Sequence, residues 1–367
     1  MLPEVRQGMR IRQTERRAVQ VKKHSFLQMV KSLALPPFLL ISGCMGEGVG
    51  ILVYDLAENR PLSFIPEETL RCQSLLIQRS ANGETFFTFD EYGKHLSKYG
   101  RRRDGKSYIA ERGINGDVVA QWETAIPPPY EPMVEMALSP DREKTAFLGR
   151  RKADIREFLI TTKEGVLLKK LTEGVEGFGG LTKGIHWLSD ETVITYARQR
   201  EGRAYHRIIR YDLKADEVKA IDYSFAFVCL NRMLPSPDSR HVLLIRGSDN
   251  DADILDPWAM TLVGEVRVVP KSVEKKSTSI DFAWLNNDEF LVWDGYSNRI
   301  IRYNISTGQS TLVEAEFPAK KYRICTFVGG HFILGSQSKG DFSKWSYNVK
   351  TKELRRIAKY AVGCIYR

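Results

Sequence analysis

Basic residues gather in three short segments of this sequence, and their side chains are suited to binding anions. The guanidinium group of arginine presents a fork of donors that can bond both oxygens of a carboxylate or phosphate. The candidate anion-binding residues are Arg101, Arg102, Arg103, Arg150, Arg151, Lys152, Arg198, Arg200 and Arg203. The alternative is that these side chains form a solvated rim without a ligand.

Three alternating acidic residues, Asp249, Asp251 and Asp253, are a weaker candidate for calcium binding. Alternate carboxylates can converge on one ion, as in the opening of a calcium loop. The sixth and twelfth positions of such a loop hold Ile254 and Met260 here, in place of glycine and glutamate, which excludes an EF-hand. We therefore predict no metal site and no cofactor, and regard a polar surface turn as the default for these aspartates.

The sequence contains no recognisable catalytic centre. It has no G-x-S-x-G elbow, no H-E-x-x-H helix and no glycine-rich phosphate loop. The five histidines after Cys44 lack metal-ligand spacing, so each is expected to be a hydrogen-bonded residue of the fold; one falls in the basic loop of the first full blade and four lie in or beside strands. They are His95, His186, His206, His241 and His331. No catalytic residue is predicted, although folding could bring histidine and acidic side chains together at a common axis.

The elements that position these residues belong to a four-strand unit, which is clearest over residues 277–316. Short β-branched and aromatic runs alternate there with clusters of Gly, Asn, Asp and Ser, a pattern typical of strands and hairpins. The segment 206–213, HRIIRYDL, is repeated closely by 299–305, RIIRYNI. A repeat of about 40 to 50 residues matches one blade of a β-propeller.

A second recurring marker is the turn between the first and second strands of each unit. Residues 138–141 read Leu-Ser-Pro-Asp, and residues 235–238 read Pro-Ser-Pro-Asp. This turn followed by an apolar strand resembles the repeat of TolB-like β-propellers, a WD-repeat-like family, over about residues 69–359. The resemblance implies an all-β propeller and is nearly silent on function, because such folds serve as scaffolds, sensors and enzyme domains.

The markers place full blades at about 69–126, 132–172, 183–223, 227–270, 277–316 and 321–359. One hairpin precedes them at 50–65, and one strand follows at 361–366. We predict that these ends pair in a shared blade that closes the ring, which makes seven blades, with six as the alternative. The loops between second and third strands would then lie on one face, where the basic segments of three adjacent blades form a crescent.

The start of the chain suggests export. From Met29 a short basic start, an apolar run and Ile41-Ser42-Gly43-Cys44 resemble a bacterial lipoprotein signal peptide with its lipobox. The resemblance implies that Cys44 is acylated and anchors the mature protein to a membrane, the outer one if the cell has two. Met29 would be the true start, although Pro36 and Pro37 weaken the apolar run as a helix. An uncleaved segment, as a membrane span or a buried helix, is the alternative.

These features predict residues 1–43 as extension and signal peptide, 44–48 as acylated cysteine and tether, and 49–367 as one propeller domain. The formal charge is +10, of which +6 belongs to residues 1–43, so composition gives little support for nucleic-acid binding. The leading hypothesis is a lipid-anchored extracytoplasmic propeller that binds a protein, peptide or glycan. The alternatives are a glycan lyase or glycosidase with its site in the central channel, and a cytoplasmic interaction propeller with a basic arm. The oligomeric state stays open.

Overall fold

The structure is a computed structural model of the chain, and strands and turns make up the part that it describes. The described residues are 38–45, 48–56, 60–66, 77–79, 85–91, 107–124, 131–150, 156–171, 178–181, 184–199, 205–224, 230–246, 251–266, 280–294, 299–313, 322–328, 331–336, 343–348, 351–358 and 365–366. Within these ranges no helix has the length and apolar character needed to cross a bilayer.

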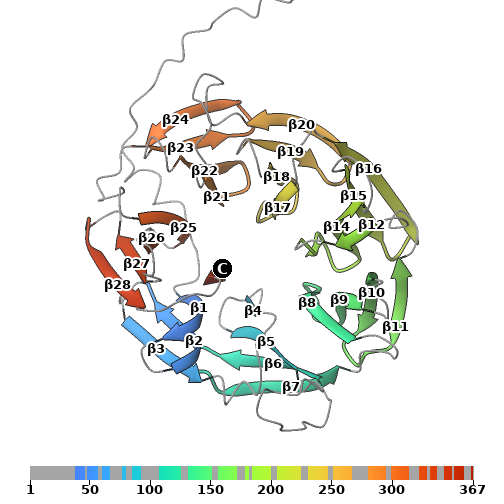
Figure 1. Ribbon diagram of the computed structural model, residues 1–367, viewed down its shortest axis with the longest axis horizontal. Coiled ribbons are helices and arrows are strands. Elements are labelled where there is room, and N and C mark those ends of the chain that lie inside the picture. The colour runs from blue at the N-terminus through green and yellow to red at the C-terminus, as the bar shows by residue number, and fades with distance from the viewer. Residues whose placement is uncertain are drawn as a thin grey trace, which may run out of the picture.

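The strands form small antiparallel sheets arranged radially around one axis, as Figure 1 shows. Six sheets consist wholly of strands that follow one another in the chain, and we number them blades 1 to 6. A seventh sheet joins the two ends of the described chain and is called the closing blade. The all-β propeller predicted from the sequence is confirmed.

The first three blades contain the following strands. Blade 1 has β4 (Ile77–Arg79), β5 (Thr85–Glu91), β6 (Ser107–Gly113) and β7 (Val118–Thr124). Blade 2 has β8 (Glu131–Leu138), β9 (Lys144–Arg150), β10 (Arg156–Thr162) and β11 (Leu167–Leu171). Blade 3 has β12 (Phe178–Leu181), β13 (His186–Trp187), β14 (Thr192–Gln199), β15 (Tyr205–Asp212) and β16 (Glu217–Ser224). In blade 3 both β12 and β13 pair with β14.

The next three blades repeat the pattern. Blade 4 has β17 (Leu230–Pro235), β18 (Val242–Arg246), β19 (Ala252–Asp256) and β20 (Thr261–Val266). Blade 5 has β21 (Ile280–Trp284), β22 (Glu289–Asp294), β23 (Arg299–Asn304) and β24 (Gln309–Val313). Blade 6 has β25 (Tyr322–Val328), β26 (His331–Ser336), β27 (Lys344–Asn348) and β28 (Leu354–Ala358). Blades 1, 4, 5 and 6 lie within the ranges predicted from the sequence markers. Blade 2 begins one residue before its range, at Glu131, and blade 3 extends beyond its range at both ends, to Phe178 and Ser224.

The closing blade brings the beginning and the end of the described chain together. Its order is β29 (Ile365–Tyr366), β1 (Phe38–Met45), β2 (Gly48–Asp55) and β3 (Arg60–Pro66). The pairing of a C-terminal strand with N-terminal ones confirms the predicted closure. Beside blade 1, the Ser63 hydroxyl donates a 2.7 Å hydrogen bond to the Ile114 carbonyl.

Strand β1 extends the propeller ahead of the start predicted at residue 49. Its eight residues pair in register with β2, from Phe38 opposite Asp55 to Met45 opposite Gly48. Cys44, the predicted acylated residue, lies opposite Val49 in this strand. A short apolar run fits a buried strand as well as the core of a signal peptide, and periodicity alone does not separate the two.

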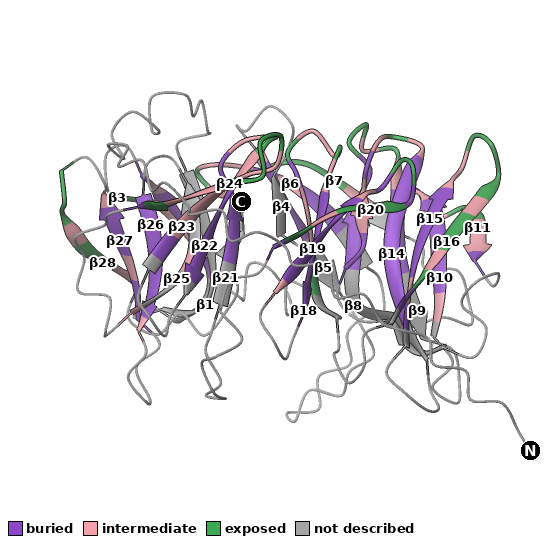
Figure 2. Ribbon diagram, turned by 90° about the horizontal axis from the view of Figure 1, so that it is seen from above, coloured by how far each residue is buried: buried purple, intermediate pink, exposed green. Residues whose placement is uncertain are grey.

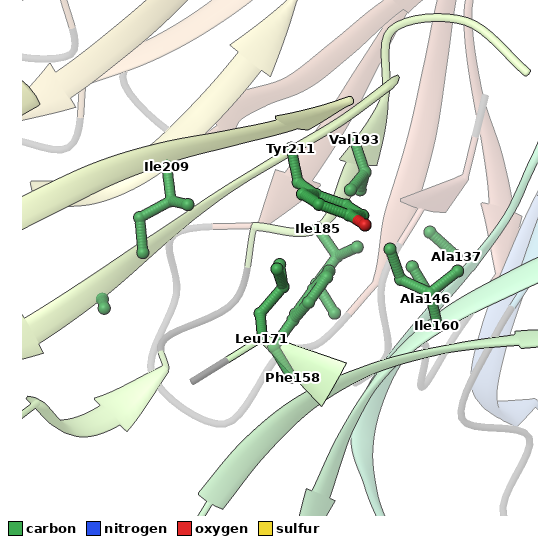
Figure 3. Close-up of a cluster of buried hydrophobic side chains, with 10 residues drawn as sticks. Ala137, Ala146, Phe158, Ile160, Leu171, Ile185, Val193, Ile209 and Tyr211 are labelled. Atoms are coloured by element: carbon green, nitrogen blue, oxygen red, sulfur yellow. The ribbon is translucent and has the colours of Figure 1, made fainter. Parts of the chain in front are cut away.

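The hydrophobic core lies in the seams between neighbouring blades, because each sheet has two apolar faces and is too small to cover them itself. One cluster joins Phe158, Ile160 and Leu171 of blade 2 to Ile185, Val193 and Tyr211 on the blade 3 side. Figure 3 shows these side chains facing each other across the seam. Figure 2 shows buried residues along the inner strands and exposed ones in the connecting turns and on outer strands such as β20 and β28.

Two turns of the Ser-Pro-Asp type have the same hydrogen bonds. In blade 2 the Ser139 hydroxyl accepts a 3.0 Å bond from the Lys144 backbone N–H. In blade 4 the Ser236 hydroxyl accepts a 3.0 Å bond from the His241 backbone N–H. Arg142 and Ser239 both have positive φ angles, of 66° and 59°, so the backbone reverses direction at equivalent positions. These bonds explain why the motif recurs at the start of second strands.

Candidate functional site

The blades present two different faces to solvent because their strands are antiparallel. Turns between first and second strands, and between third and fourth strands, lie on one face, which we call the turn face. Connections between second and third strands lie on the opposite face, which we call the loop face. The crescent of basic residues is predicted for the loop face.

Two residues of the predicted crescent lie in described strands. Arg150 ends β9, and Arg198 is the penultimate residue of β14. In the backbone register Arg150 is opposite Arg156, and Arg198 is opposite His206. Both positions are therefore at the loop-face ends of their blades, as predicted. The others, Arg101, Arg102, Arg103, Arg151, Lys152, Arg200 and Arg203, lie outside the described residues.

Blade 4 has a basic residue at the corresponding strand end, and its side chain turns inward. Arg246 ends β18 and is 4% exposed. Its guanidinium bonds Glu265 at 2.8 Å and lies 3.7 Å from both Asp251 and Asp253. We call Arg246 with these three acidic residues the Arg246 cluster. Tyr223 of blade 3 donates a hydrogen bond to Asp253, so the cluster also ties two blades together.

The Arg246 cluster accounts for two of the three aspartates considered for calcium. Asp251 and Asp253 face a guanidinium group, whose positive charge already offsets their carboxylates and would repel a second cation. Asp249 lies outside the described residues. Among the residues that the structure describes, no group of three His, Cys, Asp or Glu side chains could hold a metal ion.

A histidine and an arginine lie close together on the inner strands of blades 3 and 4. Burial, with a smaller contribution from the positive charge of Arg232, lowers the pKa of His186 to about 4, although a hydrogen bond to the Met233 backbone acts in the opposite direction. The imidazole is therefore neutral at physiological pH. Arg232 is exposed and lies opposite Ile245, one residue before Arg246, so it occupies the loop-face end of β17. Sequence reasoning missed Arg232 because an isolated arginine has no motif.

Two other described histidines are buried within their blades. His331 bonds the Ser346 hydroxyl at 2.7 Å and the Asn348 amide at 3.2 Å, and burial lowers its pKa to about 4. His206 is 1% exposed, with its ring centroid 6.0 Å from that of Tyr196. The expectation of hydrogen-bonded strand histidines is confirmed for His331. His95 lies outside the described residues.

Tyr196 also explains a glycine in the inner part of blade 3. A Cβ atom at Gly184 would lie 2.5 Å from a ring carbon of Tyr196, closer than such atoms can approach. The glycine therefore allows the Tyr196 ring to pack directly beneath the strand that carries His186. The inner wall at this seam is shaped by packing, with Arg232 as its exposed charge.

Comparison with known proteins supports the fold and does not extend to function. The chain matches no protein-family model and no curated protein sequence. It is similar to the periplasmic gluconolactonase PpgL of Pseudomonas aeruginosa, with a TM-score of 0.54 and 11% identity over 90% of this chain and 98% of that one. It is also similar to the β-propeller domain of Cps50 (Swd1) from Myceliophteria thermophila, with a TM-score of 0.51 and 10% identity over 88% and 94%. A putative 6-phosphogluconolactonase from Bacteroides uniformis gives a TM-score of 0.51 and 12% identity over 90% and 99%. The chain therefore has a propeller fold shared by proteins of different functions.

Proposed function

We propose that the protein is a binding module whose loop face recognises an anionic group on a protein, peptide or glycan partner. The observation that carries the proposal is the exposed Arg232 at the loop-face end of an inner strand, beside a histidine that stays neutral. Arg150 and Arg198 end the second strands of blades 2 and 3 on the same face. The positive charges predicted for blades 1 to 3 would thus continue into blade 4.

The deeply buried arginines stabilise the ring, which leaves recognition to the loop-face positions. Arg112 bonds the Thr88 hydroxyl at 3.1 Å, and Arg246 is held by its acidic cluster. Arg210 of blade 3 donates to the carbonyls of Pro257 and Trp258 in blade 4. A buried charge is retained when it is paired or hydrogen-bonded, and burial keeps these groups away from a ligand at the surface.

The test compares arginines on the two faces. The triple variant Arg150→Ser/Arg198→Ser/Arg232→Ser and the single variant Arg240→Ser are applied to arrays of phosphopeptides and sulfated or carboxylated glycans. Arg240 lies on the turn face, where its side chain is 78% exposed and 3.5 Å from Asp238. We expect the triple variant to lose the retained anionic ligand and Arg240→Ser to keep it. Unchanged retention by the triple variant would refute the proposal.

A second triple variant, Arg101→Ser/Arg102→Ser/Arg103→Ser, tests the crescent in blade 1, which lies outside the described residues. It should weaken the same ligands if all four blades share one surface. A second control, Arg355→Ser with Arg356→Ser on outer strand β28, removes charge at the rim of the ring. Equal losses in the control and the loop-face variants would show that net charge, and not a site, retains the ligand.

The lipid-anchored, extracytoplasmic address is a separate proposal, which the lipobox at residues 41–44 supports. Strand β1 bears on it directly, since cleavage before Cys44 would remove residues 38–43 from the closing blade. Mass spectrometry of the protein isolated from its native membrane decides between the two uses of this segment. An acylated N-terminal Cys44, absent in Cys44→Ala, is the expected result; an unacylated chain that retains residues 38–43 would refute anchoring at this residue.

An enzyme is the second candidate, and the approach of His186 to Arg232 on the inner wall is the observation that favours it. A neutral imidazole can accept a proton, and an adjacent guanidinium can stabilise a negative charge. The measurement is turnover of a panel of aldonolactones and uronic-acid glycans by the wild type and His186→Gln. Activity that the variant lacks would establish this candidate, and no turnover by the wild type would remove it.

A further inference from the structure

Among the described strands, each blade ends in an outer strand that has a partner on one side only, and such edges can pair with a strand of another molecule. The outer strands are β3, β7, β11, β16, β20, β24 and β28. Figure 1 shows them around the rim of the ring. Proteins usually block such edges with β-bulges, charged side chains or prolines.

Five of these outer strands contain a β-bulge. In each, one register shift leaves a residue of the outer strand without an opposite partner. The shifts occur where β3, β7, β11, β20 and β28 pair with their inner neighbours. The extra residues are Leu62, Val119, Leu168, Val263 and Ile357. A bulge bends and twists the strand, so its outer edge offers a poor template for a further strand.

The two remaining outer strands differ in charge. Strand β16 pairs regularly with β15 over eight residues and exposes Glu217, Lys219 and Asp222. These charges block edge pairing in place of a bulge. Strand β24 also pairs regularly with β23, yet its sequence, Gln-Ser-Thr-Leu-Val, has no charge and no proline. Among the described outer strands, β24 alone has none of these protective features.

We propose that the outer edge of β24 is an interaction surface that pairs antiparallel with β24 of a second copy of this chain. With Thr311 on the two-fold axis, the two Thr311 residues face each other, Ser310 faces Leu312, and Gln309 faces Val313. No like charges meet, and a threonine pair is a favourable cross-strand contact. Leu312 is 38% exposed. In the proposed pair, the two Leu312 side chains would lie on the same face of the joined sheet.

The neutral strand is the reason for choosing a second copy as the occupant. An isologous contact uses the same patch on both molecules, so any charge in the patch would meet itself or its neighbours across the axis. Strand β24 meets this condition without a compensating residue, and the pairing would join two four-stranded sheets into one eight-stranded sheet. The contact is small, so the association belongs to the weak class, with a dissociation constant of roughly 10 µM to 1 mM.

The test is sedimentation equilibrium of the full chain over a range of concentrations, with Leu312→Lys as the disrupting variant. A lysine at this position places one positive charge from each copy on the shared face. The change is expected to weaken association at least ~10-fold, or about 1.4 kcal/mol. Leu262→Lys on β20 is the matched control, because Leu262 is also exposed, at 48%, but lies on a bulged strand. It should leave association unchanged.

Amide hydrogen exchange of residues 309–313 provides the second readout, because edge pairing would slow it as protein concentration rises. Monomeric wild type at ~1 mM would overturn the proposal, since even at the upper limit of the expected dissociation constant about half of the chains would be paired at that concentration. Equal weakening by Leu262→Lys would overturn it as well, because the rim in general would then be responsible. Association without slower exchange at 309–313 would assign the contact to another surface.

Discussion

The seam between blades 2 and 3 and the seam between blades 4 and 5 share a backbone arrangement and a tryptophan hydrogen bond, but different side chains fill them. In the first, the indole N–H of Trp187 donates a 2.9 Å bond to the Ala137 carbonyl. In the second, the indole N–H of Trp284, 97 residues later in the chain, donates a 2.8 Å bond to the Leu234 carbonyl. Each bond runs from the inner strand of one blade to the inner strand of the preceding blade.

The side chains that fill the two seams differ in size at matching positions. In the first seam the second strand contributes the small Ala146 and the third strand the large Phe158. At the matching positions of the second seam the sizes are exchanged, with Leu243 on the second strand and Ala252 on the third. Val193 in the first seam corresponds to Phe290 in the second. The backbone geometry therefore repeats from one seam to the other, while the side chains that fill each seam are matched in size only to their own neighbours.

The seams also differ in charge at the turn face. Lys144 bridges Asp141 of its own blade at 3.0 Å and Glu191 of the next blade at 2.9 Å. The corresponding residues in the second seam are His241 and Asp288, and Asp288 accepts a 3.3 Å bond from Ser306 within its own blade. In the first seam, an ion pair across the turn face is therefore added to the backbone arrangement that the two seams share.

The largest expected effect concerns the aromatic filling of the second seam. Phe290 is fully buried, and its ring lies 5.1 Å from that of Tyr303 and 5.4 Å from that of Trp284. Phe290→Ala should lower the free energy of unfolding by about 3–5 kcal/mol. Val193→Ala at the matching position should cost only about 1–3 kcal/mol. Urea denaturation of both variants measures the difference, and equal losses would show that the seams do not depend on the size of this residue.

Removing the tryptophan hydrogen bonds should lower the free energy of unfolding by a smaller amount, which should be equal in the two seams. Trp187→Phe and Trp284→Phe keep an aromatic ring and remove the N–H donor, which leaves a buried carbonyl without its partner. Each change should lower the free energy of unfolding by about 1–3 kcal/mol, and the two losses should be similar. Trp345→Phe in blade 6 is the control, since its indole nitrogen is buried with no hydrogen-bond partner in the structure. A larger cost for the control would contradict a role for the bonds.

The smallest effect is expected from the ion pair of the first seam. Lys144→Met should lower the free energy of unfolding by about 0.2–1 kcal/mol, because the pair is partly exposed to solvent. His241→Met is the control, because it changes the matching residue in the second seam. Its free energy of unfolding should not show the salt dependence of the Lys144 variant. The measurement is urea denaturation at low and high salt.

The contribution of this ion pair should also depend on pH. Burial opposes ionisation of Asp141, yet hydrogen bonds from Ser139, the Glu143 backbone and Lys144 lower its pKa below the ordinary 3.8. A carboxyl group with a lowered pKa stabilises the fold above its unfolded pKa, and this stability is lost as pH falls through the folded value. The difference between wild type and Lys144→Met should therefore be constant near neutral pH and decline below about pH 4. A difference that persists in acid would rule out an electrostatic origin.

Much of the fold could be predicted because the local signals agree with one another. The Ser-Pro-Asp turns form their own hydrogen bonds within a few residues, and short apolar strands alternate with polar turns, so both patterns survive in the sequence. The loop-face positions of Arg150 and Arg198 followed from counting strands. Arg246 shows the limit, since it ends a strand in the same way yet points inward, toward acidic partners and beside Tyr223 of another blade.

The sequence by itself determined that the chain forms small β-sheets of similar length that close into a ring, because turn chemistry and strand alternation are local properties. Only the tertiary structure decided which charges are neutralised inside the seams, how the volumes of facing side chains match, and which outer edge is left without protection. These outcomes depend on contacts between residues about 50 positions apart, or at opposite ends of the chain as in β1 and β29. Such pairs have no short-range signature, so their arrangement becomes visible only when the blades are placed side by side.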